Sequence, residues 1–399
     1  MSRPDLVGRY TVASRAEVPP FHVMDLLAAA AERQRTHGDL LNLVAGQPMT
    51  GAPAPVVAEA TRLLSSGDAL GYTVATGIPE LREAIAAHYR ERGVGVGAED
   101  VVVTTGSSGG FLLAFLAAFE VGDRVAMARP GYPCYRNVLR SLGCQVVEID
   151  AGPATRFQPT VEQLEQLVAT SGPIAGLIVA SPANPTGTML LPEELAALAR
   201  WCEANGVQLI SDEIYHGIEY APLDGHESMT RSAWETSREA IVFGSFSKYF
   251  SMTGWRIGWM LVPPRLHRAV DILTGNFTIC PPALAQYAAV AAFTPDSYAE
   301  LDAHVRRYAV NRAILLERLP QIGFDKLAPA DGAFYIYADV SHLGVDTMEW
   351  CLGTLARTGV ALTPGVDFDT SEGDRFVRFS FAGPTEHMAE AVDRLAAVL

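Results

Sequence analysis

The sequence is poor in cysteine, and its few cysteines are not arranged as a disulfide framework or a zinc site. The 399 residues include five cysteines, which lie far apart and form no CxxC pair. An odd, scattered set of thiols is typical of a protein from a reducing compartment. We therefore expect free thiols at Cys134, Cys144, Cys202, Cys280 and Cys351.

Long hydrophobic runs are also missing. The longest apolar stretch, residues 111–119, is about half of the roughly 20 residues that a membrane-spanning helix needs. Residues 1–20 lack the apolar segment of a secretory signal. These features predict a cytoplasmic protein with no membrane partner.

Positive charge is scarce: 30 Lys and Arg stand against 45 Asp and Glu, which gives a net charge of −15. Nucleic acids attract clusters of Lys and Arg, and none stands out here, so we expect no nucleic-acid partner. The glycine patterns GxGxxG and GxxxxGK[ST] of nucleotide sites are absent as well. A hydrophobic fraction of 49% is instead typical of a globular chain with a large core, and the length favours two domains or one domain with a lobe.

Short runs rich in Val and Ile alternate with amphipathic segments between residues 101 and 262. Helical patterns lie between most of these runs, as at 108–119 and 192–205. The alternation predicts an α/β fold whose large domain has a mainly parallel seven-stranded sheet between helices, with ligands at the carboxyl ends of the strands. The predicted strands are 101–105, 124–128, 144–149, 176–180, 207–211, 240–244 and 257–262.

The last hundred residues follow a different pattern, typical of a smaller α+β lobe. Residues before about 50 match neither pattern, and we expect them to pack with that lobe. We therefore predict a large cofactor-binding domain, 49–294, and a small discontinuous domain, 1–48 with 295–399, that closes over the site. The elements predicted for the lobe are helices over 296–319, 346–358 and 385–399 and strands over 333–338 and 376–381.

One lysine follows the end of a predicted strand in apolar surroundings. Lys248 lies in the stretch SFSKYFSMTGWRIG, residues 245–258, and Arg256 follows eight residues later. One interpretation is a turn with a solvated lysine. The other is a Schiff-base nucleophile, because burial lowers the pKa of an amine and leaves it reactive. The serines and the arginine of the same stretch would then offer donors to a phosphate.

Three further stretches follow predicted strands. SPANPTG, residues 181–187, reads on its own as a turn. ISDEIY places Asp212 just past a strand end, where an acid is a helix cap or a metal ligand; no cluster of His, Cys and carboxylates surrounds it, so we expect no metal. TTGSSGG, residues 104–110, leads into a helix whose first N–H groups can bind an anion.

Together these stretches resemble the class I/II aminotransferases of the aspartate aminotransferase superfamily, which are fold type I enzymes dependent on pyridoxal 5′-phosphate. SFSKYFSMTGWRIG is similar to that family's lysine signature and SPANPTG to its NPTG block. The resemblance covers nearly the whole chain and extends to AGQP from residue 45, GYT from residue 71, PGYPCY from residue 130 and RFSF from residue 378. It implies an aminotransferase with that cofactor.

The resemblance implies catalytic roles for three residues. Lys248 would bind the cofactor covalently and later carry the proton that leaves the substrate α-carbon. Asp212 would keep the pyridine nitrogen protonated, and Tyr215 would hydrogen-bond the phenolic oxygen of the cofactor. Asn184 would share that oxygen and touch the substrate carboxylate.

The resemblance also implies the remaining binding residues. Arg378, favoured over Arg375 by its RFSF context, would grip the substrate carboxylate in a two-point fork, assisted by the backbone of Gly46. Tyr132 would stack on the cofactor ring, unless it is simply part of the core. The phosphate would be bound by Ser107 (alternatively only a helix cap), Ser108, Ser245, Ser247 and Arg256, and by Tyr72 of a neighbouring subunit, which implies a homodimer with shared sites.

The same comparison bears on the substrate side chain. Relatives selective for aspartate and glutamate place a basic residue either in the region that is 274–282 here or at the position of Ser108, and neither is basic in this chain. We therefore expect a neutral, aliphatic donor such as valine or alanine and an acceptor such as pyruvate or 2-oxoglutarate. We expect Arg136 at a solvated position on a helix. The alternative is that it points into the site and binds a carboxylate of the substrate. The residues that would suit an aliphatic side chain are Phe21, Val23 and Met24.

Other activities stay open at this point. An aspartate aminotransferase, a β-lyase that splits C–S bonds and a synthase that eliminates across the γ-carbon would share Lys248, Asp212 and Arg378, so the fold alone does not separate them. An effector-binding domain of a transcription regulator ranks lowest, because the residues before about 45 are too few for a DNA-binding domain.

Overall fold

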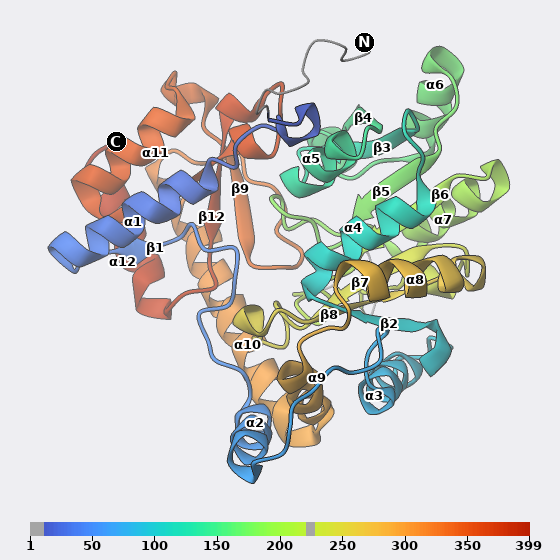
Figure 1. Ribbon diagram of the computed structural model, residues 1–399. Helices are drawn as coiled ribbons and strands as arrows, with labels where there is room; N and C mark the ends of the chain where they lie inside the picture. Colours follow the sequence, from blue (N-terminus) through green and yellow to red (C-terminus); the bar gives the residue numbers. More distant parts are fainter. Residues whose placement is uncertain (1–11, 221–227) are drawn as a thin grey trace.

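A seven-stranded sheet forms the centre of the protein in the computed structural model, which describes residues 12–220 and 228–399 (Figure 1). The strand order is β2-β8-β7-β6-β5-β3-β4, and β8 alone among these strands runs against its neighbours. All seven predicted strands are confirmed to within one residue at either end. They are β2 (Val101–Thr104), β3 (Arg124–Arg129), β4 (Gln145–Asp150), β5 (Gly176–Ala180), β6 (Gln208–Asp212), β7 (Ile241–Ser245) and β8 (Gly258–Leu261).

Both faces of the sheet are covered, which explains why its strands are continuously apolar. Val102 packs into one hydrophobic cluster while its neighbours Val101 and Val103 pack into another, because successive side chains of a strand point to opposite faces. The cluster around Val102 includes residues of α4 (Gly106–Ala118), α5 (Pro133–Ser141) and α8 (His267–Phe277). The other cluster includes residues of α3 (Pro79–Arg90), α6 (Val161–Ser171) and α7 (Pro192–Asn205).

The C-terminal lobe contains every helix and strand that its sequence pattern predicts. Its antiparallel sheet has the order β11-β12-β9 and lies beside the helices of the lobe (Figure 1). The helix predicted over 385–399 ends a few residues early. The elements are α10 (Pro295–Arg318), β9 (Tyr335–Asp339), α11 (Thr347–Thr358), β11 (Thr363–Pro364), β12 (Phe376–Ser380) and α12 (Thr385–Ala396).

The N-terminal segment lies on this lobe. Helix α1 (Val23–His37) packs on α11, and β1 (Leu41–Asn42) pairs in parallel with β10 (Val360–Ala361). Two further helices, α2 (Ala54–Ser66) and α9 (Ala283–Ala289), pack together at the opposite end of the molecule (Figure 1).

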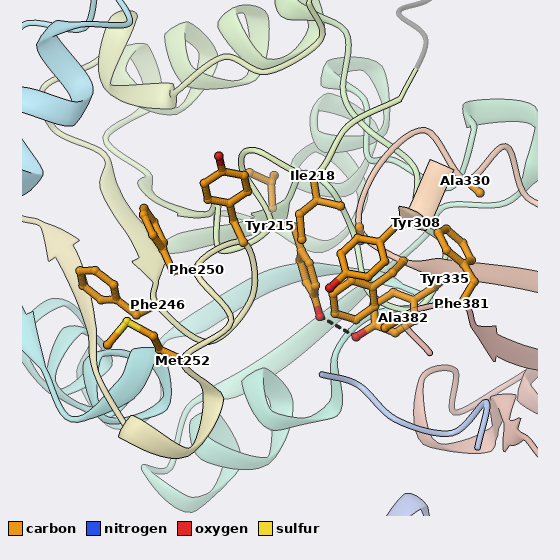
Figure 2. Close-up of a cluster of buried hydrophobic side chains, with 14 of the residues drawn as sticks. Tyr215, Ile218, Phe246, Phe250, Met252, Tyr308, Ala330, Tyr335, Phe381 and Ala382 are labelled. Carbon is orange, nitrogen blue, oxygen red and sulfur yellow. Dashed lines mark hydrogen bonds between the residues drawn. The ribbon is translucent and has the colours of Figure 1, made fainter. Parts of the chain in front are cut away.

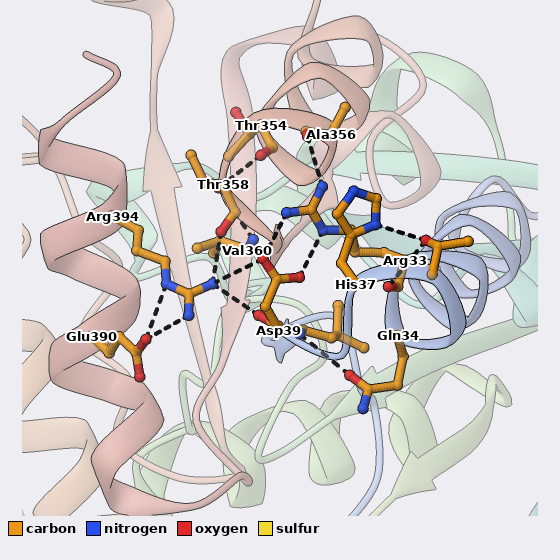
Figure 3. A network of polar contacts seen from close by, with 12 residues as sticks. Arg33, Gln34, His37, Asp39, Thr354, Ala356, Thr358, Val360, Glu390 and Arg394 are labelled. Atoms are coloured by element: carbon orange, nitrogen blue, oxygen red, sulfur yellow. Dashed lines mark hydrogen bonds and ion pairs between the residues drawn. The ribbon is translucent and has the colours of Figure 1, made fainter.

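Ion pairs fix the C-terminal end of α1 to the lobe (Figure 3). Arg33 donates from Nε and Nη2 to both carboxylate oxygens of Asp39, at 2.8 and 2.7 Å, and from Nη1 to the carbonyl of Ala356 at 3.0 Å. Arg394 of α12 donates to the carbonyls of Asp39 and Thr358, each at 2.8 Å. A bidentate arginine–carboxylate pair has a fixed geometry, so the end of α1 is held in register with α11 and α12.

A buried aromatic cluster joins the central sheet to the lobe (Figure 2). Tyr215, three residues beyond β6, packs edge to face on Phe334 and on Tyr335 of β9, with ring centroids 5.6 and 5.8 Å apart. The hydroxyls of Tyr215 and Tyr335 are hydrogen-bonded at 2.7 Å. The lobe is therefore seated at the carboxyl end of the strands, where the sequence places its motifs.

All five cysteines are free thiols, as expected. Within residues 12–220 and 228–399, no helix is both long and apolar enough to cross a membrane, and no group of side chains could hold a metal ion.

Candidate active site

A cavity of about 360 Å³ opens at the carboxyl ends of the central strands, between the sheet, the N-terminal segment and the lobe. This is where ligands bind in open α/β sheets. All predicted site residues except Ser245 and Tyr72 line it. They are Gly46, Ser107, Ser108, Tyr132, Asn184, Asp212, Tyr215, Ser247, Lys248, Arg256 and Arg378.

Lys248 follows β7 and points into this cavity. Its Nζ donates to the carbonyl of Gly46 at 2.5 Å and lies 5.3 Å from the ring centre of Tyr215. Burial lowers the pKa of the amine to about 8; the positive charges of Arg378 and Arg256 act in the same direction, and Asp212 opposes them. Lys248 is thus a partly buried lysine whose pKa lies nearer to neutral pH than that of a solvated turn lysine.

Asp212 ends β6 and is buried at the floor of the cavity. Its Oδ1 accepts the N–H of Ile214 at 3.1 Å, and its Oδ2 accepts the hydroxyl of Tyr135. Burial raises the pKa of the carboxyl to about 6, while these two hydrogen bonds and Lys248 oppose the rise. The carboxylate is thus held in one orientation beside the cavity.

Tyr135 was missed in the sequence. It lies one turn beyond Tyr132 at the start of α5, and residues three apart on a helix share a face. That spacing was the available signal, since Tyr132 was already a candidate. Phe111 and Thr253 also line the cavity without having been predicted.

The first turn of α4 faces Arg256 across the cavity. Gly106 begins the helix with φ +65°, and a Cβ on it would collide with the Arg256 guanidinium. A Cβ on Gly258 would lie 2.8 Å from the backbone nitrogen of Ser107, so a glycine there lets β8 approach the helix start. Free N–H groups and an arginine at one helix N-terminus form an anion site. The side chains of Ser107 and Ser108 line the cavity at the same point.

Ser245 lies beside this anion site but outside the cavity. Its hydroxyl accepts the N–H of Ser247 at 3.0 Å and is buried. In this structure Ser245 therefore shapes the turn that carries Ser247 and Lys248.

Arg378 enters the site from β12 of the lobe. Its Nη1 donates to Asn184 Oδ1 at 2.8 Å, and its Nη2 donates to the carbonyl of Val44 at 2.7 Å. The guanidinium lies 4.4 Å from the ring centre of Tyr335. Its Nε is buried and has no hydrogen-bond partner. An unsatisfied donor on a buried cation costs free energy, which a hydrogen bond to a ligand anion would recover.

Arg375 differs from Arg378 in all these respects. It pairs with Asp339 and Glu372, at 2.9 and 2.7 Å, on the outer side of the lobe. Arg378 is therefore the arginine that the fold places in the cavity.

One wall of the cavity is apolar and comes from the start of α1. Phe21, Val23, Met24 and Leu27 line it, and the ring of Phe21 meets that of Tyr132 edge to face at 6.3 Å.

Arg136 corrects a prediction. It was expected to be solvated, yet it is only 4% exposed, and its Nη2 donates to the carbonyl of Asp367 at 2.6 Å. A segment of the lobe covers this part of α5, and no local pattern in the sequence indicates that contact. Arg136 does not line the cavity either.

Tyr72 does not line the cavity of its own chain, and it is 83% exposed. Phe277 and Ile279, in the region compared above with dicarboxylate-selective relatives, are exposed as well.

The chain belongs to the class I and II aminotransferases. The model of the family described as "Aminotransferase class I and II" matches residues 38–395, which confirms the resemblance seen in the sequence. Enzymes of this family use pyridoxal 5′-phosphate, and the protein is an aminotransferase dependent on that cofactor.

Individual relatives match over nearly the full length. A valine–pyruvate aminotransferase of Mycobacterium tuberculosis is 61% identical over 97% of this chain and 98% of its own. An aspartate aminotransferase of Thermotoga maritima is 34% identical over 95% and 97%. The crystal structure of an aminotransferase from Mycobacterium tuberculosis superposes with a TM-score of 0.93 at 61% identity, covering 98% of this chain and 99% of that one. Aspartate aminotransferase from Thermus thermophilus with maleate gives a TM-score of 0.89 at 32% identity, covering 98% and 100%.

The residues present fit pyridoxal 5′-phosphate. The cavity combines an amine of lowered pKa, a buried carboxylate and an anion site at a helix start. Because Gly106 has no side chain, Arg256 lies close to the start of α4, where an anionic group can bind. The Nε of Arg378 has no hydrogen-bond partner and can donate to a second anionic group.

The lowered pKa of Lys248 predicts how the cofactor-free enzyme takes up its cofactor. Only the neutral amine attacks a carbonyl, so the rate of uptake should rise with pH through about 8 and then level off. Arg378→Met removes a positive charge that lowers this pKa, so the rise should move to higher pH. Stopped-flow absorbance after mixing with pyridoxal 5′-phosphate measures the rate.

Arg375→Met provides the matched control, because Arg375 is an arginine of the same lobe that points away from the cavity. Its profile should coincide with that of the wild type. A flat rate between pH 7 and pH 9 in the wild type would contradict the assignment of a lowered pKa to Lys248.

Proposed function

We propose that this aminotransferase moves the amino group of a neutral, aliphatic amino acid such as valine or alanine to a 2-oxo acid such as pyruvate or 2-oxoglutarate. The observation that carries the proposal is the apolar wall formed by the start of α1. Among the described residues that line the cavity, the cations are Lys248, Arg256 and Arg378, each of which has another task below. The relative named a valine–pyruvate aminotransferase supports the same conclusion.

Pyridoxal 5′-phosphate, when bound, supplies a carbonyl that takes up the amino group and a ring that accepts the electrons left behind by the departing proton. Lys248 would hold it covalently, Asp212 would pair with the pyridine nitrogen, and Tyr215 and Asn184 would hydrogen-bond the phenolic oxygen. Tyr132 would stack on the ring. The phosphate would be held by the start of α4 and by Ser107, Ser108, Ser247 and Arg256, while Ser245 holds Ser247 in position through its backbone N–H.

Lys248 also moves the proton. When it is not bound to the cofactor, its Nζ would take the proton from the substrate α-carbon and would later give it up again. A pKa of about 8 lies close enough to neutral pH for the amine to act in both directions. Asp212 stays ionised above about pH 6, so its charge is available over the same range.

Arg378 orients the substrate. Asn184 and the carbonyl of Val44 hold its two Nη atoms, so the plane of the guanidinium is fixed before the carboxylate arrives. The backbone of Gly46 assists. The side chain of the substrate then points toward the start of α1.

Two chains are proposed to share their sites. Tyr72, Val74, Phe277 and Ile279 are exposed, and the segments that carry them are joined by a hydrogen bond from the N–H of Thr73 to Cys280 Sγ at 3.4 Å. An apolar patch of this kind is typical of an interface. In the homodimer Tyr72 reaches the phosphate of the neighbouring chain.

We also propose the division into a large domain, 49–294, and a small domain, 1–48 with 295–399. The pairing of β1 with β10 supports it. A cytoplasmic location is proposed as well, and the free cysteines support it.

Replacement of the lysine tests the mechanism. Lys248→Ala should lose the yellow absorption band that borohydride abolishes in the wild type, and turnover should fall by about 10³-fold or more because both covalent binding and proton transfer are lost. Lys326→Ala is the matched control, since Lys326 is the other lysine of the sequence and is exposed in the lobe. Normal turnover by Lys248→Ala would refute the mechanism.

A donor screen tests the substrate class. The value of kcat/KM for valine or leucine with pyruvate, and for alanine with 2-oxoglutarate, should exceed that for aspartate with the same acceptor by about tenfold or more, because a carboxylate side chain would lose its hydration against an apolar wall. The reverse preference would mark an aspartate aminotransferase. Pyruvate and ammonia released from cystathionine without any oxo acid would instead mark a β-lyase.

The shared site is tested by Tyr72→Phe. Light scattering should show a dimer for the wild type and for the variant, while the affinity for pyridoxal 5′-phosphate falls by about tenfold in the variant because one hydrogen bond to the phosphate is lost. Tyr287→Phe, at another exposed tyrosine, should leave that affinity as it is. A monomeric wild type would rule the shared site out.

A further inference from the structure

The start of α1 is capped from a distant part of the chain. The N–H groups of His22 and Val23 donate to the two carboxylate oxygens of Asp367, at 2.9 and 2.7 Å, across 345 and 344 residues of sequence. The first N–H groups of a helix have no partner within the helix, and the N-cap residue His22 supplies no side-chain bond of its own. Asp367 therefore fills the place of a capping residue, with a charge that the helix dipole favours.

Asp367 is itself held in position. It is 2% exposed and ends a short 3-10 turn, Gly365–Asp367, that follows β11. Its carbonyl accepts from Arg136 Nη2 at 2.6 Å, and the carbonyl of Phe368 accepts the N–H of Gly131 at 2.8 Å. The cap is thus attached to the segment that leads into α5, close to Tyr132.

Both ends of α1 are consequently fixed by ionic groups. The C-terminal end is held against the lobe because Arg33 donates to the carbonyl of Ala356 and Arg394 donates to the carbonyl of Asp39 (Figure 3). Asp367 holds the other end, next to the residues of α1 that line the cavity. Because the C-terminal end of α1 is held independently of Asp367, the hydrogen bonds to Asp367 determine where the start of the helix lies over the cavity.

We propose that Asp367 is a positioning residue for the substrate side chain: by capping α1 it fixes Phe21, Val23 and Met24 as the wall against which an aliphatic side chain packs. Asp367 does not line the cavity and acts through the helix. The inference rests on the proposed function, because it assigns that wall to the side chain of the amino donor.

An amino donor with a branched side chain contacts this wall more extensively than a donor with a small side chain does. The two methyl groups of valine are attached to its β-carbon and extend toward the wall, whereas the side chain of alanine ends at the β-carbon. One methylene group in a shaped apolar pocket changes kcat/KM by about tenfold or more. Loss of the cap should therefore lower the valine-to-alanine ratio of kcat/KM, mainly through the KM for valine.

The experiment compares Asp367→Ala with Asp346→Ala in the enzyme loaded with cofactor. Asp346 caps α11 in the same lobe, its Oδ1 accepting the N–H of Glu349 at 2.8 Å, and it does not line the cavity. With 2-oxoglutarate as acceptor, the valine-to-alanine ratio should fall by about fivefold or more in Asp367→Ala and stay at the wild-type value in Asp346→Ala. An unchanged ratio in a folded, yellow Asp367→Ala enzyme would overturn the proposal.

Amide hydrogen exchange supplies a readout that does not depend on activity. The peptide that contains residues 21–27 should exchange faster in Asp367→Ala than in Asp346→Ala or the wild type, because two of its N–H groups lose their acceptor. Equal exchange in all three proteins would also overturn the proposal. If the wild type uses neither valine nor alanine, the proposed function fails, and the exchange experiment still decides whether Asp367 fixes α1.

Two more variants apply if Asp367→Ala does not fold. Asp367→Asn keeps the shape of the cap but loses its charge and one acceptor oxygen, so the ratio should fall in the same direction. Phe21→Ala removes part of the wall directly and should lower the ratio as well. A wild-type ratio in both variants would overturn the proposal.

Discussion

The site depends on the burial of an amine and a carboxylate at one edge of the central sheet. Asp212 ends β6, and Lys248 follows the end of the adjacent strand β7. A charge withdrawn from water costs several kcal/mol unless polar groups compensate it. The carbonyl of Gly46 accepts a hydrogen bond from Lys248, and Asp212 accepts hydrogen bonds from Tyr135 and from the N–H of Ile214. The pKa values of about 8 and about 6 follow from this balance, and both lie near the pH at which proton transfer is useful.

That burial requires the lobe and the N-terminal segment to be in place. Gly46 reaches Lys248 from the N-terminal segment, Arg378 reaches Asn184 from the lobe, and Tyr335 reaches Tyr215 from the same side. These contacts join parts of the chain that are more than a hundred residues apart. The bonds that dock the lobe are therefore the same bonds that exclude water from the reacting groups.

The sequence predicts the elements well and the contacts between them less well. Strands buried on both faces are continuously apolar, so all seven were found, and local motifs located Lys248 and Asp212. Tyr135 acts through Asp212, which lies 77 residues away, and no local pattern carries that bond. Arg136 looked solvated because its cover, Asp367, comes from 231 residues further along the chain. Ser245 belongs to the lysine motif, but its hydroxyl is turned to the backbone of Ser247.

Chemistry and substrate choice lie on different elements of this fold. The proton-transfer groups belong to the sheet edge, whose residues are held by strands buried on both faces. The side-chain wall belongs to α1 and to Phe21 just before it, whose ring meets that of Tyr132 at the start of α5. A change in α1, or in the Asp367 cap that holds it, can therefore alter which side chain fits without moving Lys248 or Asp212. One relative, 34% identical to this chain, is named an aspartate aminotransferase. Enzymes of one fold can differ in substrate in this way when the catalytic groups and the substrate wall lie on different elements.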